Sequence, residues 1–136
     1  MSEQTADPII RLLAGHPIFA DLPDRTLEEL ARSCLISSFK KGHRLITENQ
    51  ATQDMFIILS GQARVTINGT EVGRLNAGEV AGEISSAGIS PPIADVVADT
   101  DIEALAIPRA VLNDISAEHA GFKKRLRQAA FRRIQK

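Results

Sequence analysis

The residues of this chain most able to do chemistry lie around two Gly-Glu pairs, at positions 78–79 and 82–83. The second pair is followed by small and polar residues with helical potential, a Pro pair at 91–92 and a β-branched strand. Glycine lets the backbone approach a ligand closely, and the free N–H groups at a helix N-terminus bind anions. The pattern predicts a pocket for a small phosphate ligand. However, no Lys or Arg lies between Arg74 and Arg109 to balance the charge of a phosphate.

The composition indicates a single domain. With 136 residues, 43% hydrophobic and 24% charged, the chain can bury one core. Its apolar runs are far below the roughly 18 to 20 residues that a membrane-spanning helix needs. The polar, acidic N-terminus does not resemble a signal peptide. Cys34 is the single cysteine and excludes an internal disulfide, so we expect a cytoplasmic protein with a buried structural thiol.

Charge is unevenly distributed along the chain, whose net charge is −1. Residues 1–116 carry nine basic and 16 acidic side chains, whereas residues 117–136 carry seven basic and one acidic. Apolar side chains recur in the second stretch at helical steps, namely Phe122, Leu126, Ala129 or Ala130, and Ile134. This pattern is typical of a basic amphipathic helix. We expect it to pack on the acidic body, a protein partner or a second copy; nucleic acid or an acidic membrane is the less favoured alternative.

The hydrophobic period is helical at both ends of the chain and close to two between them. Strands are predicted at 35–39, 44–47, 55–60, 63–68, 71–75, 94–98 and 102–107. Asn68-Gly69 indicates a two-residue hairpin, because both residues accept positive φ. The expected fold class is α+β, mainly β: an antiparallel jelly-roll β-barrel (double-stranded β-helix) flanked by N-terminal and C-terminal helices. The expected domain, 1–136, comprises N-terminal helices (1–34), the barrel (35–108) and C-terminal helices (109–136).

Helix boundaries are predicted from the residues that begin or end helices. A first helix is expected to begin at Asp7-Pro8, since Pro is tolerated at the first helical position, and to stop at Gly15. Asp24 is expected to cap a second helix. A short helix is expected from Pro108 to Ile115, followed by a final one capped by Ser116 and ending near Gln135.

Three stretches of the sequence resemble the cyclic nucleotide-binding domain found in catabolite-activator-type regulators and in regulatory subunits of cAMP-dependent kinase. They are Leu45-Ile46-Thr47-Glu48, then Met55-Phe56-Ile57-Ile58-Leu59-Ser60-Gly61-Gln62-Ala63, then Leu75 through the two Gly-Glu pairs. The combination of the Ile57–Gly61 strand and turn with Gly82-Glu83 is specific to this family. The match covers nearly the whole chain, so the resemblance implies the same barrel and flanking helices.

The resemblance also implies a phosphate-binding cassette. Gly82 would let the backbone approach the ligand, and the carboxylate of Glu83 would accept a hydrogen bond from the ribose 2′-hydroxyl. The helix that follows would direct free N–H groups at the cyclic phosphate. The residues so assigned to ligand binding are Gly82, Glu83, Ile84, Ser85, Ser86, Pro92, Ile93, Ala94 and Asp95.

The family places an Arg in this cassette to neutralise the phosphate, and the family spacing puts that position at Pro92. Family Ser or Thr positions fall on Ile93 and on Asp95, whose carboxylate would add negative charge. Removing one partner of a buried charge pair costs about 2–5 kcal/mol, which is roughly 30-fold to several thousand-fold in affinity. We therefore expect weak binding of cAMP or cGMP, or none, unless Arg64, Arg74 or a residue of the last helix supplies the charge.

The sequence contains no other arrangement that predicts chemistry. No Ser-His-Asp or Cys-His grouping and no paired carboxylates stand in a catalytic pattern, so an enzyme is not expected. His16, His43 and His119 lack the spacing of a metal site and are expected to be surface or capping residues. The expected function is a non-enzymatic regulatory or sensor module without a bound cofactor. The alternative is a ligand-free scaffold for protein interaction or dimerisation through the basic C-terminal helix.

Overall fold

The computed structural model describes residues 2–47, 54–82 and 94–135. In the first helix the side chains are described from Pro8 onward, and in the last helix they are described up to Gln128. Its helices within these ranges are α1 (Ser2–Ala14), α2 (Asp24–Ser33), α4 (Arg109–Glu118) and α5 (Ala120–Gln135). Its strands are β1 (Leu35–Phe39), β2 (Arg44–Ile46), β3 (Asp54–Ser60), β4 (Ala63–Ile67), β5 (Thr70–Leu75), β6 (Val80–Ala81), β7 (Asp95–Ala98) and β8 (Ile102–Pro108).

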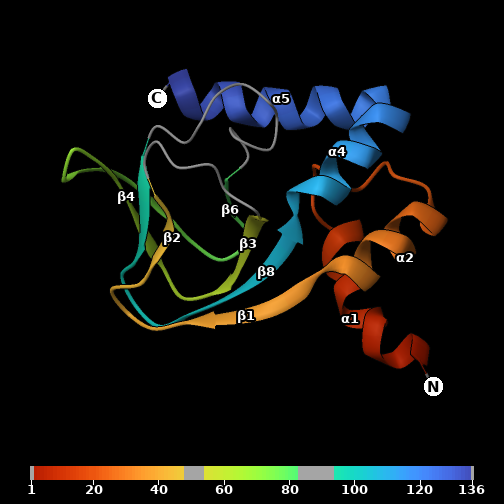
Figure 1. The fold of residues 1–136 in the computed structure, drawn as a ribbon, viewed down its shortest axis with the longest axis horizontal. Coiled ribbons are helices and arrows are strands. Elements are labelled where there is room, and N and C mark those ends of the chain that lie inside the picture. The colour runs from red at the N-terminus through yellow and green to blue at the C-terminus, as the bar shows by residue number, and fades with distance from the viewer. Residues whose placement is uncertain (1, 48–53, 83–93, 136) are drawn as a thin grey trace.

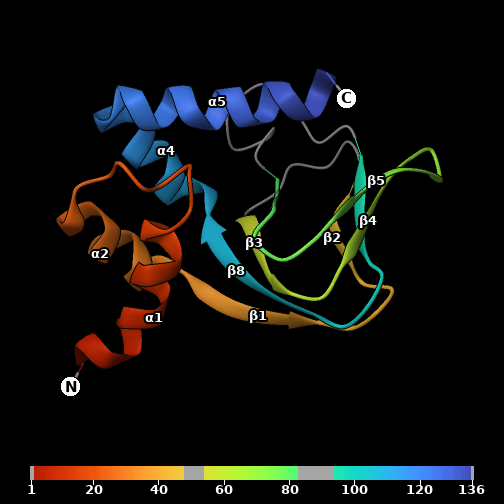
Figure 2. The same cartoon turned by 180° about the vertical axis from the view of Figure 1, so that it is seen from behind.

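The described strands form two four-stranded sheets in which neighbouring strands are antiparallel. One sheet has the order β1-β8-β3-β6 and the other β2-β7-β4-β5. Figure 1 shows α1, α2 and α4 gathered beside the first sheet, with α5 running from α4 across the barrel. Figure 2 shows the same arrangement from behind, with the end of α5 above β4 and β5. The fold class expected from the sequence, a jelly-roll barrel flanked by helices, is confirmed.

The sheet β1-β8-β3-β6 separates two apolar cores. Along β8, Leu105 and Ile107 belong to a core shared with the helices, whereas the alternating Ala104 and Ala106 belong to the barrel interior. Successive side chains of a strand point to opposite faces, so one strand serves both cores. The core shared with the helices includes Leu13, Phe19, Leu27, Leu30, Cys34, Leu112, Phe122 and Leu126. The barrel interior includes Ile46, Phe56, Ile58, Ala63, Leu75, Ala81, Val96, Ala98 and Ile102.

The strand predictions agree with the structure at all seven predicted places, to within one residue at each end. The Asn68-Gly69 hairpin is confirmed, because Ile67 pairs with Thr70 and the two turn residues have φ of 51° and 82°. One strand was not predicted. β6 has only two residues, too few to show a period, and it is defined by its pairing with β3.

Three predicted helix boundaries are wrong. The helix α1 begins at Ser2 and contains Pro8 in its interior, where Pro has no N–H to donate to the preceding turn. The N-cap of α2 is Pro23, and Asp24 lies in the first turn, where its charge complements the helix dipole. Ser116 lies inside α4, and the break before α5 falls at His119, which has an extended backbone. This break lets α4 and α5 both contribute side chains to the core shared with the helices.

Gly61→Ala is expected to destabilise the barrel strongly. Gly61 has φ of 92°, and an added Cβ would fall well inside van der Waals contact with the carbonyl oxygen of Asp101. The backbone strain alone should lower the free energy of unfolding by about 1–3 kcal/mol, and the clash should add to it. Gly69→Ala is the matched control, because Gly69 has φ of 82° but nothing within 4 Å of the added Cβ. Urea unfolding of both variants measures the difference, and equal losses would contradict the close approach at Asp101.

Candidate functional site

Gly82 lies at the end of β6, where the two sheets come close together. Its φ is 92°, and an added Cβ would lie 3.2 Å from the Asp54 carbonyl oxygen and 3.4 Å from Ile46 Cδ1. Asp54 begins β3 in one sheet, and Ile46 ends β2 in the other. Only glycine combines this backbone conformation with so little space. The structure therefore supplies the physical reason for a glycine at the position where the sequence predicts close approach to a ligand.

The other predicted site residues divide between described and undescribed parts of the chain. Six of them lie outside the described residues, namely Glu83, Ile84, Ser85, Ser86, Pro92 and Ile93. Ala94 directly precedes β7, and Asp95 is the first residue of that strand. The structure thus describes the two ends of the predicted cassette, with Gly82 at one end and Ala94 and Asp95 at the other.

Asp95 lies on the outer side of its strand. Val96 and Ala98 belong to the barrel interior, and a strand alternates its faces, so the Asp95 side chain points away from that interior. Its Oδ2 atom lies 3.9 Å from Nε of Arg44. The negative charge that the sequence analysis expected to add to the pocket is thus placed beside a cation on the outer face.

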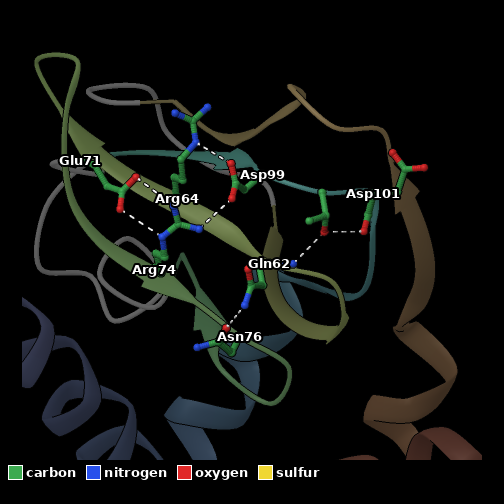
Figure 3. A network of polar contacts seen from close by, with 8 residues as sticks. Gln62, Arg64, Glu71, Arg74, Asn76, Asp99 and Asp101 are labelled. Carbon is green, nitrogen blue, oxygen red and sulfur yellow. Dashed lines mark hydrogen bonds and ion pairs between the residues drawn. The ribbon is translucent and has the colours of Figure 1, made fainter.

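Arg64 and Arg74, the two barrel residues considered as substitutes for the missing cation, are held together by Asp99 (Figure 3). Nη1 of Arg74 donates to Oδ2 of Asp99 at 2.7 Å, and Nε of Arg64 lies 3.2 Å from Oδ1 of the same carboxylate. Nε of Arg74 also donates to Oε2 of Glu71 at 3.1 Å. The hydrogen bond from Arg74 lowers the pKa of Asp99, and the same bond raises the pKa of Arg74.

Strand alternation explains why these two arginines point outward. Arg64 lies on β4 next to Ala63, and Arg74 lies on β5 next to Leu75; both neighbours are interior residues. Arg64 and Arg74 are opposite each other in the ladder and therefore share the outer face. Among the described residues, the charged side chains of this sheet thus form ion pairs outside the barrel, and its interior is apolar.

A shallow hollow of about 270 Å³ lies at the other end of β3, away from Gly82. It is lined by Ser38, Phe39, Lys40, Ser60, Asp101, Ile102 and Glu103. None of the predicted site residues lines it. Among the described residues, no three His, Cys, Asp or Glu side chains are grouped as in a metal site.

The prediction of a buried structural thiol at Cys34 is confirmed. Cys34 is buried in the core shared with the helices, and its Sγ donates to the Leu30 carbonyl oxygen at 3.2 Å. Burial raises the pKa of Cys34 to about 12, and the charge of Asp54 adds to the effect. The thiolate is the reactive form, so this cysteine is chemically inert at neutral pH.

His16 is half-buried between the end of α1 and the turn before β6. Nε2 lies 3.1 Å from the Gly78 carbonyl oxygen, and Nδ1 accepts a hydrogen bond from the Ile18 N–H at 3.3 Å. The second bond fits the expected capping role, whereas the first joins parts of the chain that are 62 residues apart. No sequence signal indicated this long-range contact, because a single His after a helix does not reveal its partner.

Acidification should weaken the native state through His16. Burial lowers the pKa of His16 below its ordinary value of 6.5, although the Gly78 carbonyl opposes the shift. Protons then bind the unfolded chain first, so the contribution of His16 is complete above pH 6.5 and is lost as the pH falls from 6.5 through the folded pKa.

Urea unfolding between about pH 7.5 and pH 5 measures this loss, and it should be smaller in His16→Gln than in the original chain. The charged groups nearby are Glu79 in the same turn and the Asp21–Arg125 ion pair. They are present in both proteins, so the difference between the two pH dependences reports on His16. An identical pH dependence in the two proteins would contradict the role of His16.

An antiparallel jelly-roll barrel with helices packed on one sheet is the architecture of the cyclic nucleotide-binding class of fold, which a solved structure of that class shares with this chain. The family model for the cyclic nucleotide-binding domain matches residues 36–119, and this chain belongs to that family. The family is one of cyclic nucleotide-binding domains. Within the described residues, no helix is both long and apolar enough to cross a membrane.

Comparison with known proteins gives the same result. The chain is 25% identical over 115 residues to the cGMP-dependent protein kinase of Toxoplasma gondii, a match that covers 83% of this chain and 12% of the kinase. Its structure resembles the regulatory subunit of a cAMP-independent protein kinase A from Trypanosoma cruzi bound to guanosine, with a TM-score of 0.71 at 21% identity over 89% of this chain and 48% of that one.

The chain also resembles a Geobacter metallireducens protein whose description names cyclic nucleotide binding. The TM-score is 0.78 at 20% identity, and the match covers 93% of this chain and 95% of that one. At these identities the solved structures establish a shared fold. The chain spans about an eighth of the Toxoplasma kinase and about half of the Trypanosoma subunit.

Proposed function

We propose that this chain is a non-enzymatic regulatory module, a single domain over 1–136, whose affinity for cAMP and cGMP is weak or lost. The observation that carries the proposal is the placement of the barrel arginines. Arg44, Arg64 and Arg74 all pair with carboxylates on the outer face of their sheet. The sequence has Pro92 where the family has the phosphate-binding Arg. These three arginines are paired on the outer face, which supports the view that none of them replaces that Arg.

Electrostatics supports the same proposal. The barrel interior beside Gly82 is built from apolar side chains, including Ile46, Ala81 and Val96. A cyclic phosphate brought into such surroundings loses water and gains no opposite charge. Backbone N–H groups could offset part of this cost. The lost charge pair, worth about 2–5 kcal/mol, would remain absent.

Calorimetric titration of the intact chain with cAMP and cGMP tests the proposal. We expect no saturation below about 1 mM ligand, where the binding free energy is about −4 kcal/mol. Micromolar binding would overturn the proposal. In that case, titrating Arg132→Ala and Arg133→Ala would reveal whether the basic helix supplies the cation, because both residues lie in the basic C-terminal stretch.

A neutral nucleoside is a second candidate ligand. The sequence keeps Gly82-Glu83, which the family uses at the ribose, and lacks the Arg that the family uses at the phosphate. The Trypanosoma cruzi subunit of similar fold is described as bound to guanosine, a nucleoside without phosphate. We expect guanosine to bind at least as tightly as cGMP, because it brings no unbalanced charge into the pocket. A parallel titration with guanosine and cGMP measures this order, and tighter binding of cGMP would exclude the candidate.

A scaffold function through α5 is supported by one observation. Lys123, Lys124 and Arg127 are exposed on this helix and form no ion pair with the described residues. They could bind an acidic surface on a second copy or on another protein. Sedimentation of the intact chain and of a variant with Glu at all three positions tests whether the chain self-associates through this helix. A monomer in both cases would remove dimerisation through this face.

A further inference from the structure

The segment between α1 and α2 is attached to two distant parts of the molecule. The backbone of Ile18 is held on both sides: its N–H donates to Nδ1 of His16 at 3.3 Å, and its carbonyl oxygen accepts from Nε of Arg125 at 3.1 Å. Arg125 belongs to α5, and its Nη1 also donates to Oδ2 of Asp21 at 3.2 Å. A residue of the last helix thus holds the segment at two points.

The other attachment is the turn that precedes β6. Nε2 of His16 donates to the Gly78 carbonyl oxygen at 3.1 Å. The turn is itself bound to β3 of the barrel, because the Gly78 N–H donates to the Ile58 carbonyl oxygen at 2.7 Å and the Ile58 N–H donates to the Glu79 carbonyl oxygen at 2.9 Å. Four residues after Gly78 the chain reaches Gly82, the described end of the predicted cassette.

The two hydrogen bonds of His16 require each other. A neutral imidazole has one N–H and one bare nitrogen. If Nδ1 accepts from Ile18, the ring proton must lie on Nε2, which is then the donor that the Gly78 carbonyl needs. The contacts therefore connect Gly78 through His16 and the backbone of Ile18 to Arg125.

Apolar packing supports the same path. Phe19 is fully buried, with its ring centre 5.5 Å from that of Phe122 on α5 and 5.8 Å from that of His16. Ile18 and Leu22 are buried in the same core. Close-packed cores transmit displacements because they have little free volume. Among the hydrogen bonds made by described side chains, the bond from His16 to Gly78 is the one that joins residues 1–34 to the barrel.

We propose that residues 16–22 form a latch that couples the turn 76–79 to α5. His16 and Arg125 are its positioning residues: one fixes the latch to the turn, and the other fixes it to the helix. A displacement at either end shifts the equilibrium at the other end, as coupling through contiguous contacts requires. This proposal does not depend on which ligand the barrel binds.

Amide hydrogen exchange of the intact chain, followed residue by residue by NMR at neutral pH, tests the latch. In Arg125→Ala, the amide of Gly78 should exchange at least about fivefold faster, the lower end of typical coupling between sites. Arg127→Ala is the matched control, because Arg127 lies on the same helix, is exposed and pairs with no described residue. It should leave Gly78 within about twofold. Unchanged exchange at Gly78 in Arg125→Ala would overturn the proposal.

The reverse experiment and a remote amide separate coupling from general destabilisation. His16→Ala should accelerate exchange at Lys123, whose N–H donates to the His119 carbonyl oxygen at the start of α5. The amide of Val65, in the distant β4, should keep its rate in each variant. If amide exchange at Val65 accelerates as much as at Gly78, the experiment is repeated with Arg125→Lys in place of Arg125→Ala. This milder variant keeps the charge beside Asp21. Equal acceleration at Val65 and Gly78 in that variant would also refute the latch.

Discussion

Pro92→Arg should raise the affinity for cAMP by about 30-fold or more. The reason is electrostatic: a guanidinium at this family position would supply the charge-assisted, forked contact to the cyclic phosphate that Pro cannot make. A buried charge pair of this kind is worth about 2–5 kcal/mol, or roughly 30-fold to several thousand-fold in affinity. Calorimetric titration of Pro92→Arg and the original chain with cAMP measures the gain.

Two further variants show whether charge is responsible. Pro92→Gln adds a side chain of similar reach without charge and should gain at most a few fold. Asp95→Thr combined with Pro92→Arg should add little, because Asp95 lies beside Arg44 on the outer face of β7. If Pro92→Arg gains no affinity, Pro92 is not at the phosphate-binding position and the family alignment of this part of the sequence is wrong.

Phe122→Ala should have the largest effect on stability, lowering the free energy of unfolding by about 3–5 kcal/mol. Phe122 is fully buried near the start of α5, against the ring of Phe19 and in the same core as Leu126. Truncation removes the apolar transfer energy of the ring and leaves a cavity that close-packed neighbours fill only in part. Urea unfolding monitored by circular dichroism measures the loss.

Lys123→Ala is the matched control for this prediction. Lys123 is the next residue on the same helix and is exposed. Its replacement should change the free energy of unfolding by no more than about 0.5 kcal/mol, as is usual on a surface without partners. A loss below about 1 kcal/mol in Phe122→Ala would mean that α5 does not pack on the core shared with the helices.

The barrel was predictable because local signals agree with its topology. The continuous apolar run of β8 is typical of a strand buried on both faces, and the hairpin at 68–69 follows from two residues that tolerate positive φ. β6 was missed because two residues have no period. The break at His119 was missed because it has neither Gly nor Pro and is set by packing of α4 and α5 on one core.

The candidate site was only partly predictable. Gly82 could be identified, but the reason for it, contact with Asp54 and Ile46, depends on strands 28 and 36 residues earlier in the chain. The outward direction of Arg64 could be predicted from the alternation of side chains along a strand, because Arg64 lies between Ala63 and the apolar Val65. Its partner Asp99 could not be predicted, because the pairing of β4 with β7 joins residues that are far apart in the sequence.

Because β8 is shared by two cores, the barrel and the helices are not separable parts. A fragment of residues 35–108, without the helices on either side, would expose Met55, Ile57, Leu105 and Ile107 to water as one continuous apolar surface. An apolar surface of this kind on an open sheet favours aggregation. Experiments on a truncated barrel would therefore report aggregation instead of ligand recognition.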